Sequence, residues 1–402
     1  MFDLNKFISE KVIKRKQSMF LKDIKANENK ISEKISGKTV LVIGGAGSIG
    51  SSFIRAVLNY SPGALVVVDI DENALAELTR DLRSTKNIYI PDDYIPYPMD
   101  FASPVFEKMF KNRKGFDIVA NFSAHKHVRS EKDIYSVEAL LQNNILNAKK
   151  LLDLLSIFPP EEYFCVSTDK AANPVNIMGA SKRIMEDVIF AYSDKFPVKT
   201  ARFANVAFSN GSLPAGFISR ISKFQPLSAP LDVERYFVSP EESGQICMLA
   251  CMLGGNREIF FPKLEETQMM KFSQIADMLL HEYGYEVLAC SSDEEAINEA
   301  LNLKYGSMKY PVHYSFSDTS GEKEIEEFFT DYETVEMDRF NSLGVITGKE
   351  IPDISKIDIF FRNIEKAFIN TNVSKEDIVE IIEEYLPGFD HIEKGKSLDS
   401  KM

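Results

Sequence analysis

Hydrophobic and polar positions form alternating blocks along the chain from about residue 38 onward. Short apolar runs end in glycine or polar residues, and longer segments with helical spacing separate them. The apolar runs are residues 38–45, 64–71, 116–124, 162–169 and 198–206, and the helical segments include residues 51–60, 137–155 and 181–193. Nearly continuous apolar strands that alternate with helices are typical of a parallel sheet covered on both faces. The pattern therefore predicts an α/β fold with a doubly wound parallel sheet.

The N-terminal segment differs from the rest of the chain in composition. Basic residues outnumber acidic ones in residues 1–36, and Phe7, Ile8, Val12 and Ile13 recur with near-helical spacing. One or two amphipathic helices are expected there. We predict that this N-terminal helical extension packs on its own main domain or on a neighbouring subunit. Peripheral contact with a membrane surface is the alternative.

Two regions follow this extension. Residues 37–205 contain the alternating strands and helices, whereas residues 206–402 are richer in loops. Loop-rich segments of doubly wound proteins usually carry substrate contacts, so the second region is expected to be a smaller substrate-binding part, with some segments returning to the sheet. We interpret the acidic stretch 321–336 as the solvated face of a helix and not as a metal site.

Composition and charge narrow the classes of function. The chain has 402 residues, and its net charge of −13 argues against nucleic acid as a partner. We find no apolar run of transmembrane length, no secretory signal and no C-x-x-C pair among the four cysteines, so a cytoplasmic protein with free thiols is expected. The five histidines form no ligand cluster, so no metal site is predicted.

A glycine-rich turn follows the first predicted strand and opens a helix. Gly44, Gly47 and Gly50 have G-x-x-G-x-x-G spacing, with Ser48 and Ile49 at the start of the helix. Glycines in this context allow a tight turn and a close approach of backbone to a pyrophosphate, which the helix amides then bind. The turn therefore predicts a dinucleotide site.

Acidic residues at the ends of the next strands indicate which dinucleotide binds. Asp69 ends the second strand, where a carboxylate accepts from the adenosine ribose hydroxyls and repels a 2′-phosphate. This favours NAD over NADP, although Asp71 is an alternative ribose contact and Asp69 is alternatively a turn or helix-capping residue. Asp100, at the end of the next strand, is a further candidate for a contact with the adenine amino group.

The stretch from residue 164 to residue 183 carries the candidate chemistry. Asp169 and Lys170 follow Thr168 directly at the end of a strand, the edge where open α/β sheets bind ligands. An acid beside an amine suits an elimination, because the amine removes a proton next to a carbonyl and the acid protonates a departing hydroxyl. Lys182 lies one helical turn after Met178, on the same helix face, where it can contact the nicotinamide ribose. A solvated Asp-Lys turn and a surface lysine are the alternative interpretations.

The segment 167–183, "STDKAANPVNIMGASKR", resembles the nucleotide-sugar 4,6-dehydratases of the extended short-chain dehydrogenase/reductase superfamily, specifically those acting on UDP-N-acetylglucosamine. The family's Asp-Lys pair falls on Asp169 and Lys170. Its catalytic tyrosine falls on Met178, and one branch of the family is similar in having methionine there. Segments 122–128, 202–217 and 234–239 also resemble family motifs, with Ala204 and Phe208 replacing glycines.

The resemblance implies a Rossmann-like extended fold, bound NAD, a UDP-sugar substrate and a homo-oligomer. It places substrate contacts at Lys126, Asn205, Ser212 and Arg235. It also implies oxidation of the sugar at C4, removal of the C5 proton by Lys170, loss of the C6 hydroxyl with a proton from Asp169, and hydride return to C6.

Three points stay open at this stage. With Met178 in place of tyrosine, Thr168, a water or a relay through Asp169 are candidates for the base at the C4 hydroxyl. The C5 configuration is expected to be retained, because the motif contains no extra titratable residue on the opposite face and the C-terminal segment resembles retaining relatives. A UDP-sugar 4-epimerase or dehydrogenase, and a scaffold without catalysis, are the competing functions.

Overall fold

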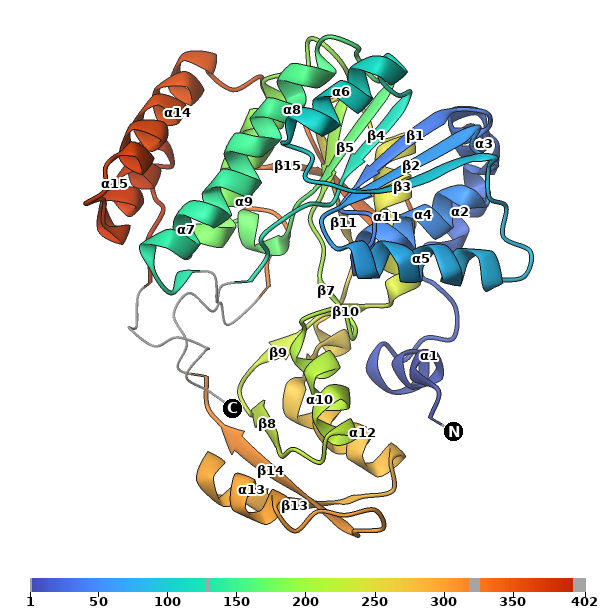
Figure 1. Ribbon diagram of the computed structural model, residues 1–402, viewed down its shortest axis with the longest axis vertical. Helices are drawn as coiled ribbons and strands as arrows, with labels where there is room; N and C mark the ends of the chain where they lie inside the picture. The colour runs from blue at the N-terminus through green and yellow to red at the C-terminus, as the bar shows by residue number, and fades with distance from the viewer. Residues whose placement is uncertain (1, 128–130, 318–325, 393–402) are drawn as a thin grey trace.

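The computed structural model describes residues 2–127, 131–317 and 326–392. Its larger lobe is built on a nine-stranded sheet in the order β15-β16-β11-β6-β5-β4-β1-β2-β3 (Figure 1). The strands are β1 (Thr39–Ile43), β2 (Ala64–Asp69), β3 (Asp93–Pro98), β4 (Ile118–Asn121), β5 (Glu162–Val166), β6 (Val198–Ala201), β11 (Glu258–Pro262), β15 (Thr334–Glu336) and β16 (Leu343–Thr347). The run from β3 to β11 is parallel, and β16 and β15 add to it in antiparallel pairs.

Helices cover both faces of this sheet, because the strands carry apolar side chains on both sides. Along β1, Leu41 and Ile43 belong to one hydrophobic cluster, whereas Val40 and Val42 belong to another. The first face carries α6 (Pro104–Arg113), α7 (Ile134–Leu141), the π-helical segment η3 (Gln142–Asn147), α8 (Ala148–Leu155) and α9 (Ile177–Phe190), with α14 (Ile354–Ile369) and α15 (Lys375–Tyr385) packed outside them. The second face carries α2 (Leu21–Ala26), α3 (Glu28–Ile35), α4 (Ser48–Leu58), α5 (Glu72–Ser84) and α11 (Pro240–Leu253). The predicted doubly wound α/β fold is thereby confirmed.

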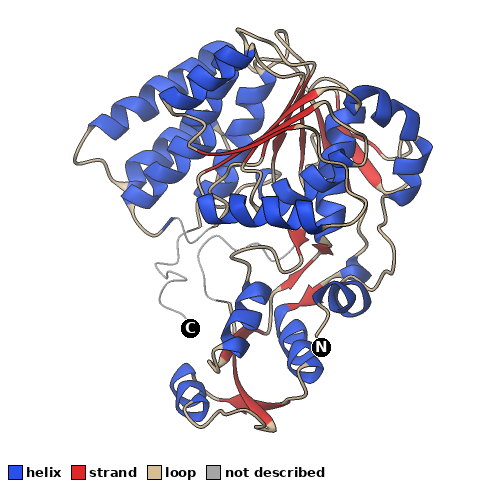
Figure 2. Cartoon of the chain, turned by 45° about the vertical axis from the view of Figure 1, so that its right-hand side comes forward, coloured by secondary structure: helices blue, strands red, loops and turns tan. Residues whose placement is uncertain are grey.

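A smaller lobe lies below the carboxyl ends of the parallel strands (Figure 2). It contains α10 (Leu213–Ser222), α12 (Phe272–Glu282), α13 (Asp293–Ala300) and a three-stranded sheet of β13 (Glu286–Cys290), β14 (Lys309–Ser315) and β8 (Leu227–Pro230). Short ladders join the lobes, namely β7 (Asn205–Val206) with β10 (Phe237–Val238) and β9 (Glu234–Arg235) with β12 (Met270–Lys271). Single 3-10 turns are η4 (Asp169–Ala171) and η5 (Glu266–Gln268).

The N-terminal extension packs against its own chain. It begins with α1 (Leu4–Phe7) and the π-helical segment η1 (Ile8–Val12), and Phe7, Ile8 and Val12 are buried among apolar residues of the smaller lobe. Arg15 then pairs with the buried Glu242 at 2.7 Å. These apolar side chains are therefore covered by the smaller lobe of the same chain, whereas packing on the main domain or on a neighbouring subunit was expected. Among the described residues, no helix is long and apolar enough to cross a membrane.

Candidate active site

The glycine turn between β1 and α4 forms a cradle of backbone atoms. Gly44 has a φ of +70°, and a Cβ atom there would lie 2.7 Å from the amide nitrogen of Ser123. At Gly50 a Cβ atom would lie 2.3 Å from the carbonyl oxygen of Gly44, so both positions require glycine. Gly47 is the N-cap residue of α4 and has no side chain to accept from the helix amides. A Cβ atom at this position would contact only the carbonyl oxygen of Gly44, at 3.4 Å. The first amides of α4, at Ser48 and Ile49, therefore remain free of a side-chain cap, as a phosphate site requires.

Asp69 lies beside this cradle. Its carboxylate accepts hydrogen bonds from the amides of Ala46, at 3.0 Å, and Asp71, at 3.1 Å. Asp71 instead caps α5 by accepting from the amide of Ala74 at 2.9 Å. The two candidates for the ribose contact therefore differ in their surroundings. The Asp71 carboxylate caps α5, whereas the Asp69 carboxylate faces the glycine turn. Asp100 is exposed and lies two residues beyond β3, where its side chain accepts from the amide of Ala102. Its contact with the adenine amino group stays a prediction.

Thr168, Asp169 and Lys170 form a connected group where β5 ends. The hydroxyl of Thr168 donates to Asp169 Oδ1 at 2.7 Å, and Lys170 Nζ lies 3.4 Å from both carboxylate oxygens of Asp169. Asp169 is buried, with 5% of its side chain exposed, whereas the side chain of Lys170 is 24% exposed. A buried acid and a partly exposed amine therefore lie together, so the interpretation as a fully solvated turn does not fit Asp169.

Helix α9 supplies the two other residues of the motif. Its start is capped by Asn176, whose side chain accepts from the amide of Gly179 at 2.7 Å. Lys182 is buried and donates to the carbonyl of Val166 at 3.0 Å, and burial lowers its pKa. It is therefore not a surface lysine. Met178 is also buried, within the hydrophobic cluster beneath α9.

A π-helical turn positions a residue that the sequence analysis did not select. Asn144, in η3, accepts from the amide of His125 at 2.9 Å and donates to the carbonyl of His125 at 2.9 Å and to Ser181 Oγ at 3.0 Å. It thereby joins the loop after β4 to α9 next to Lys182. The signal in the sequence was the run of three amide side chains, residues 142–144, inside an otherwise apolar helix.

The proposed substrate residues lie on several elements around the same strand edge. Lys126 donates to the carbonyl of Asn210 at 3.1 Å, and burial lowers its pKa. Ser212 caps α10 by accepting from the amide of Ala215, so its side chain has a structural role. Asn205 and Arg235, from β7 and β9, meet at a carboxylate that the sequence analysis did not place in the site.

That carboxylate is Glu326, and the helix expected over residues 321–336 is wrong in its described part. Residues 326–336 contain turns and β15 but no helix. Glu326 is buried, and only 6% of the side chain of Glu333 is exposed. Glu326 accepts from the side chain of Asn205 at 2.6 Å and from the amide of Tyr236 at 2.8 Å, and Arg235 Nε lies 3.8 Å away. Charge density in the sequence suggested exposure, but buried partners from distant segments satisfy these carboxylates.

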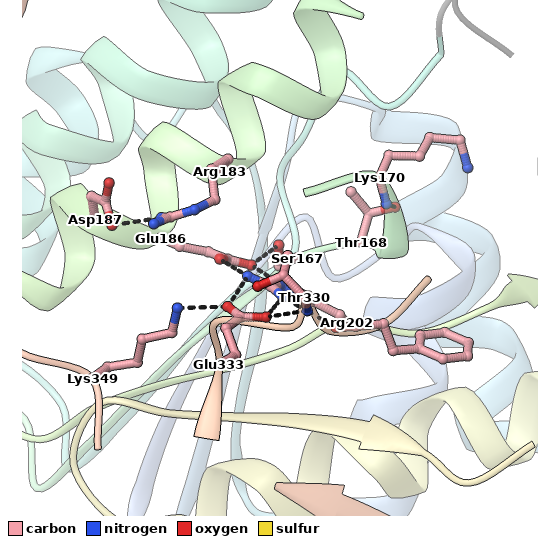
Figure 3. Close-up of polar contacts among 11 residues, drawn as sticks. Ser167, Thr168, Lys170, Arg183, Glu186, Asp187, Arg202, Thr330, Glu333 and Lys349 are labelled. Carbon is pink, nitrogen blue, oxygen red and sulfur yellow. Dashed lines mark hydrogen bonds and ion pairs between the residues drawn. The ribbon is translucent and has the colours of Figure 1, made fainter. Parts of the chain in front are cut away.

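An ion-pair network holds this C-terminal segment against β5 (Figure 3). Arg202 is fully buried, binds Glu186 through Nε and Nη2 at 2.8 and 2.6 Å, and binds Glu333 through Nη1 and Nη2 at 2.8 and 3.0 Å. Ser167, directly before Thr168, donates to Glu186 at 2.7 Å. The same arginine also donates to the carbonyl of Phe328 at 3.1 Å. Arg202 therefore links the segment that carries Glu326 to the residues that follow β5 and lead to Asp169.

Comparison with known proteins agrees with this architecture. Residues 40–346 match a family described as polysaccharide biosynthesis protein, and the chain belongs to this family. An uncharacterized membrane protein of Methanocaldococcus jannaschii is 29% identical over 88% of this chain and 98% of its own length. The polysaccharide biosynthesis protein EpsC of Bacillus subtilis is 29% identical over 68% of this chain, which spans 45% of that relative. An inverting UDP-N-acetylglucosamine 4,6-dehydratase of Campylobacter jejuni is 27% identical over 65% of this chain and 76% of its own length.

Solved structures show the same fold at low sequence identity. Pen from Bacillus thuringiensis aligns with a TM-score of 0.63 at 18% identity, over 82% of this chain and 98% of that one. DesIV, a dTDP-glucose 4,6-dehydratase from Streptomyces venezuelae with NAD bound, aligns with a TM-score of 0.51 at 17% identity, over 69% of this chain and 88% of that one. The fold is that of the Rossmann-like extended short-chain dehydrogenases.

Proposed function

We propose that the protein catalyses the NAD-dependent 4,6-dehydration of UDP-N-acetylglucosamine to a UDP-4-keto-6-deoxy-N-acetylhexosamine. The observation that carries the proposal is the Asp169–Lys170 pair, which lies at the carboxyl edge of the parallel sheet with its acid buried. Oxidation or epimerisation at C4 alone needs no acid beside an amine at this edge, whereas removal of a proton and a hydroxyl from neighbouring carbons uses both. The Campylobacter relative with this activity supports the same substrate.

The cradle around Gly47 fits a dinucleotide, because the backbone approaches closely where side chains would clash. Gly44, Gly47 and Gly50 would accommodate the pyrophosphate with the amides of Ser48 and Ile49, and Asp69 would bind the adenosine ribose. NAD, when bound there, would take hydride from C4 and return it to C6.

The chain's own residues carry the proton transfers. Lys170 would remove the C5 proton, which the adjacent C4 ketone makes acidic. Asp169 would protonate the C6 hydroxyl as it leaves. Lys182, buried and bonded to the carbonyl of Val166, would place positive charge at the sugar edge of the cofactor site. Met178 can neither donate nor accept a proton, so the C4 hydroxyl loses its proton to another group.

Incubation of the purified protein with UDP-N-acetylglucosamine tests this proposal. The expected result is loss of substrate and formation of a 4-keto-6-deoxy product without net accumulation of NADH. A C4 isomer would establish an epimerase instead, and an unchanged substrate would favour a scaffold or a different sugar.

The same product reports the configuration at C5. The sequence favours retention, whereas the Campylobacter relatives at 27% and 26% identity are inverting enzymes. Retention stays a prediction of the sequence. Proton NMR of the product, formed in deuterated water, distinguishes a gluco-type C5 from an inverted one.

A further inference from the structure

The loop that joins β7 to α10, residues 207–212, connects the glycine cradle with the smaller lobe. The amide of Asn210 donates to the hydroxyl of Ser48, the first residue of α4, at 2.9 Å. The carbonyl of the same Asn210 accepts from Lys126, in the segment after β4, at 3.1 Å. The loop is therefore bonded to two segments at the carboxyl edge of the sheet, and one of them is the helix start that is proposed to bind phosphate.

Phe208, near the beginning of this loop, has a left-handed backbone conformation. Its φ is +55°, a region that glycine enters freely and that a residue with a Cβ atom disfavours. The motif that residues 202–217 resemble has glycine at this position, so the substitution by phenylalanine adds strain to the loop. Such a conformation persists only where surrounding contacts offset the strain.

The N-terminal extension supplies such a contact. The ring of Phe7, the last residue of α1, meets the ring of Phe208 edge to face, with the centroids 5.9 Å apart and the planes at 79°. Phe7 is buried in the apolar cluster of the smaller lobe, against which Phe208 also packs. Edge-to-face aromatic pairs stabilise by more than the apolar area that they bury. The ring of Phe7 therefore favours the strained conformation of Phe208.

A second contact fixes the extension relative to the same loop. Arg15 donates to the carbonyl of Phe237 at 3.1 Å and pairs with Glu242. Phe237 lies in β10, the partner of β7, and the amide of Ala207 donates to the carbonyl of Val238 at 2.9 Å. The extension thus contacts both the strand pair that leads into the loop and the aromatic ring near the loop's beginning.

We propose that the N-terminal extension holds the loop 207–212 against the cofactor cradle through Phe7, and thereby tightens the binding of the dinucleotide. Phe7 and Phe208 are positioning residues, which act on the cradle through the bond between Asn210 and Ser48. Without the ring of Phe7, the strain at Phe208 is no longer offset, and the backbone returns to a negative φ. The bond to Ser48 then breaks. A cradle that is ordered in advance binds more tightly, because less conformational freedom is lost on binding. The inference rests on the proposed NAD site and assigns a role in it to the extension.

The test compares Phe7→Ala with the matched control Tyr285→Ala. Tyr285 packs against the same apolar cluster, where its ring contacts that of Tyr310 at 5.0 Å and an angle of 60°. Both substitutions remove an aromatic pair from the smaller lobe, but only the first removes the ring contact with Phe208. We expect Phe7→Ala to raise the Kd for NAD roughly 10-fold, the factor that corresponds to the strain of one left-handed residue other than glycine. Tyr285→Ala should leave this Kd unchanged, and an equal rise in both variants overturns the proposal.

Glycine at position 208 provides the rescue. It adopts the left-handed conformation without strain, so the loop no longer depends on the ring of Phe7. In the Phe208→Gly background, Phe7→Ala should therefore change the Kd for NAD less than about twofold. A merely structural role of Phe7 would give the same loss in both backgrounds, and that result overturns the proposal. If Phe7→Ala does not fold, Phe7→Leu keeps most of the buried volume without the aromatic ring, and the same outcomes apply.

Hydrogen exchange of the free protein tests the loop without any cofactor or sugar. The amide of Asn210, which is bonded to Ser48, should exchange faster in Phe7→Ala than in the wild type, and at an unchanged rate in Tyr285→Ala. Unchanged exchange in Phe7→Ala overturns the proposal. Faster exchange, together with a wild type that binds no NAD, overturns the proposed function and leaves the positioning of the loop by Phe7 standing.

Discussion

Arg202 and Glu186 form a bidentate ion pair in which both side chains are completely buried. The pair lies between β5, which leads to Asp169, and the C-terminal segment that contains Glu333 (Figure 3). A buried charge left without its partner is far more costly than an exposed one, so this contact ties the site to the stability of the larger lobe.

Replacement of Arg202 by lysine should therefore destabilise the protein strongly. Lysine cannot form the planar fork that binds Glu186 and Glu333 together, and the loss should be about 3–5 kcal/mol in the free energy of unfolding by urea. The matched control is Arg80→Lys on the surface of α5, whose pair with Glu77 is exposed and should be worth less than about 1 kcal/mol. Similar effects of the two substitutions would contradict this role of Arg202.

Asp169→Asn and Lys170→Ala should each suppress product formation and leave cofactor binding close to normal. The reason is that the pair lies at the strand edge, whereas the glycine cradle is formed by the turn after β1. Product is measured by NMR, and NAD binding by direct titration. Near-full activity in either variant would refute the assigned elimination roles.

NAD should bind more tightly than NADP, because the carboxylate of Asp69 faces the glycine turn and repels a 2′-phosphate. Asp69→Ser should narrow the difference between the two affinities in a direct titration. Asp71→Ala is the comparison, since loss of its carboxylate should weaken the cap of α5 by about 1 kcal/mol without changing the preference for NAD. Equal affinities of the wild type for NAD and NADP would show that Asp69 does not discriminate between the two cofactors.

Met178→Leu should retain most of the activity. The side chain is buried in a hydrophobic cluster and has no proton to exchange, so a residue of similar volume should cost less than about 1.5 kcal/mol. Thermal unfolding and product formation are both measured. A complete loss of product in a folded variant would mean that the sulfur atom itself has a role.

The stability of the protein should depend on the protonation of Glu326. Its pKa is raised in the folded protein to about 7 by burial and by Asp169, so the folded state binds more protons than the unfolded state between about pH 4.5 and 7. Stability attributable to this group is fully present below that window and is lost as the pH rises through it. The free energy of unfolding of Glu326→Gln, measured relative to the wild type, should therefore be higher at pH 8 than at pH 5. The expected increase is up to about 3 kcal/mol. Equal differences at both pH values in urea unfolding would contradict the shift.

The pKa of Glu333 shifts in the opposite direction to that of Glu326, although both residues belong to the same segment. Burial alone would raise its pKa, but Arg202 and Lys349 lower it to about 2. Its contribution to stability is present above about pH 4.5 and is lost only as the pH falls toward 2. Two glutamates in one acidic stretch thus differ because of what faces them and not because of their local sequence.

Much of the architecture follows from the sequence alone. The apolar runs from Thr39 to Ala201 and the helices between them specify a parallel sheet, because only burial on both faces stabilises such strands. Gly44 and Gly50 specify the turn after β1, because any side chain there would collide with the backbone. Asp169, Lys170 and Lys182 could be selected because each has a fixed position relative to the end of β5.

The tertiary structure decided what depends on contacts between distant segments. Glu326 and Asn144 were not selected, because a carboxylate or an amide is polar in any sequence, and only its buried partners distinguish a site residue from an exposed one. The partners of Glu326 lie 121 and 90 positions away in the chain, at Asn205 and Tyr236. Local periodicity thus determined the sheet and its carboxyl edge, whereas the desolvation and charge that set a carboxylate's protonation exist only once the chain has folded.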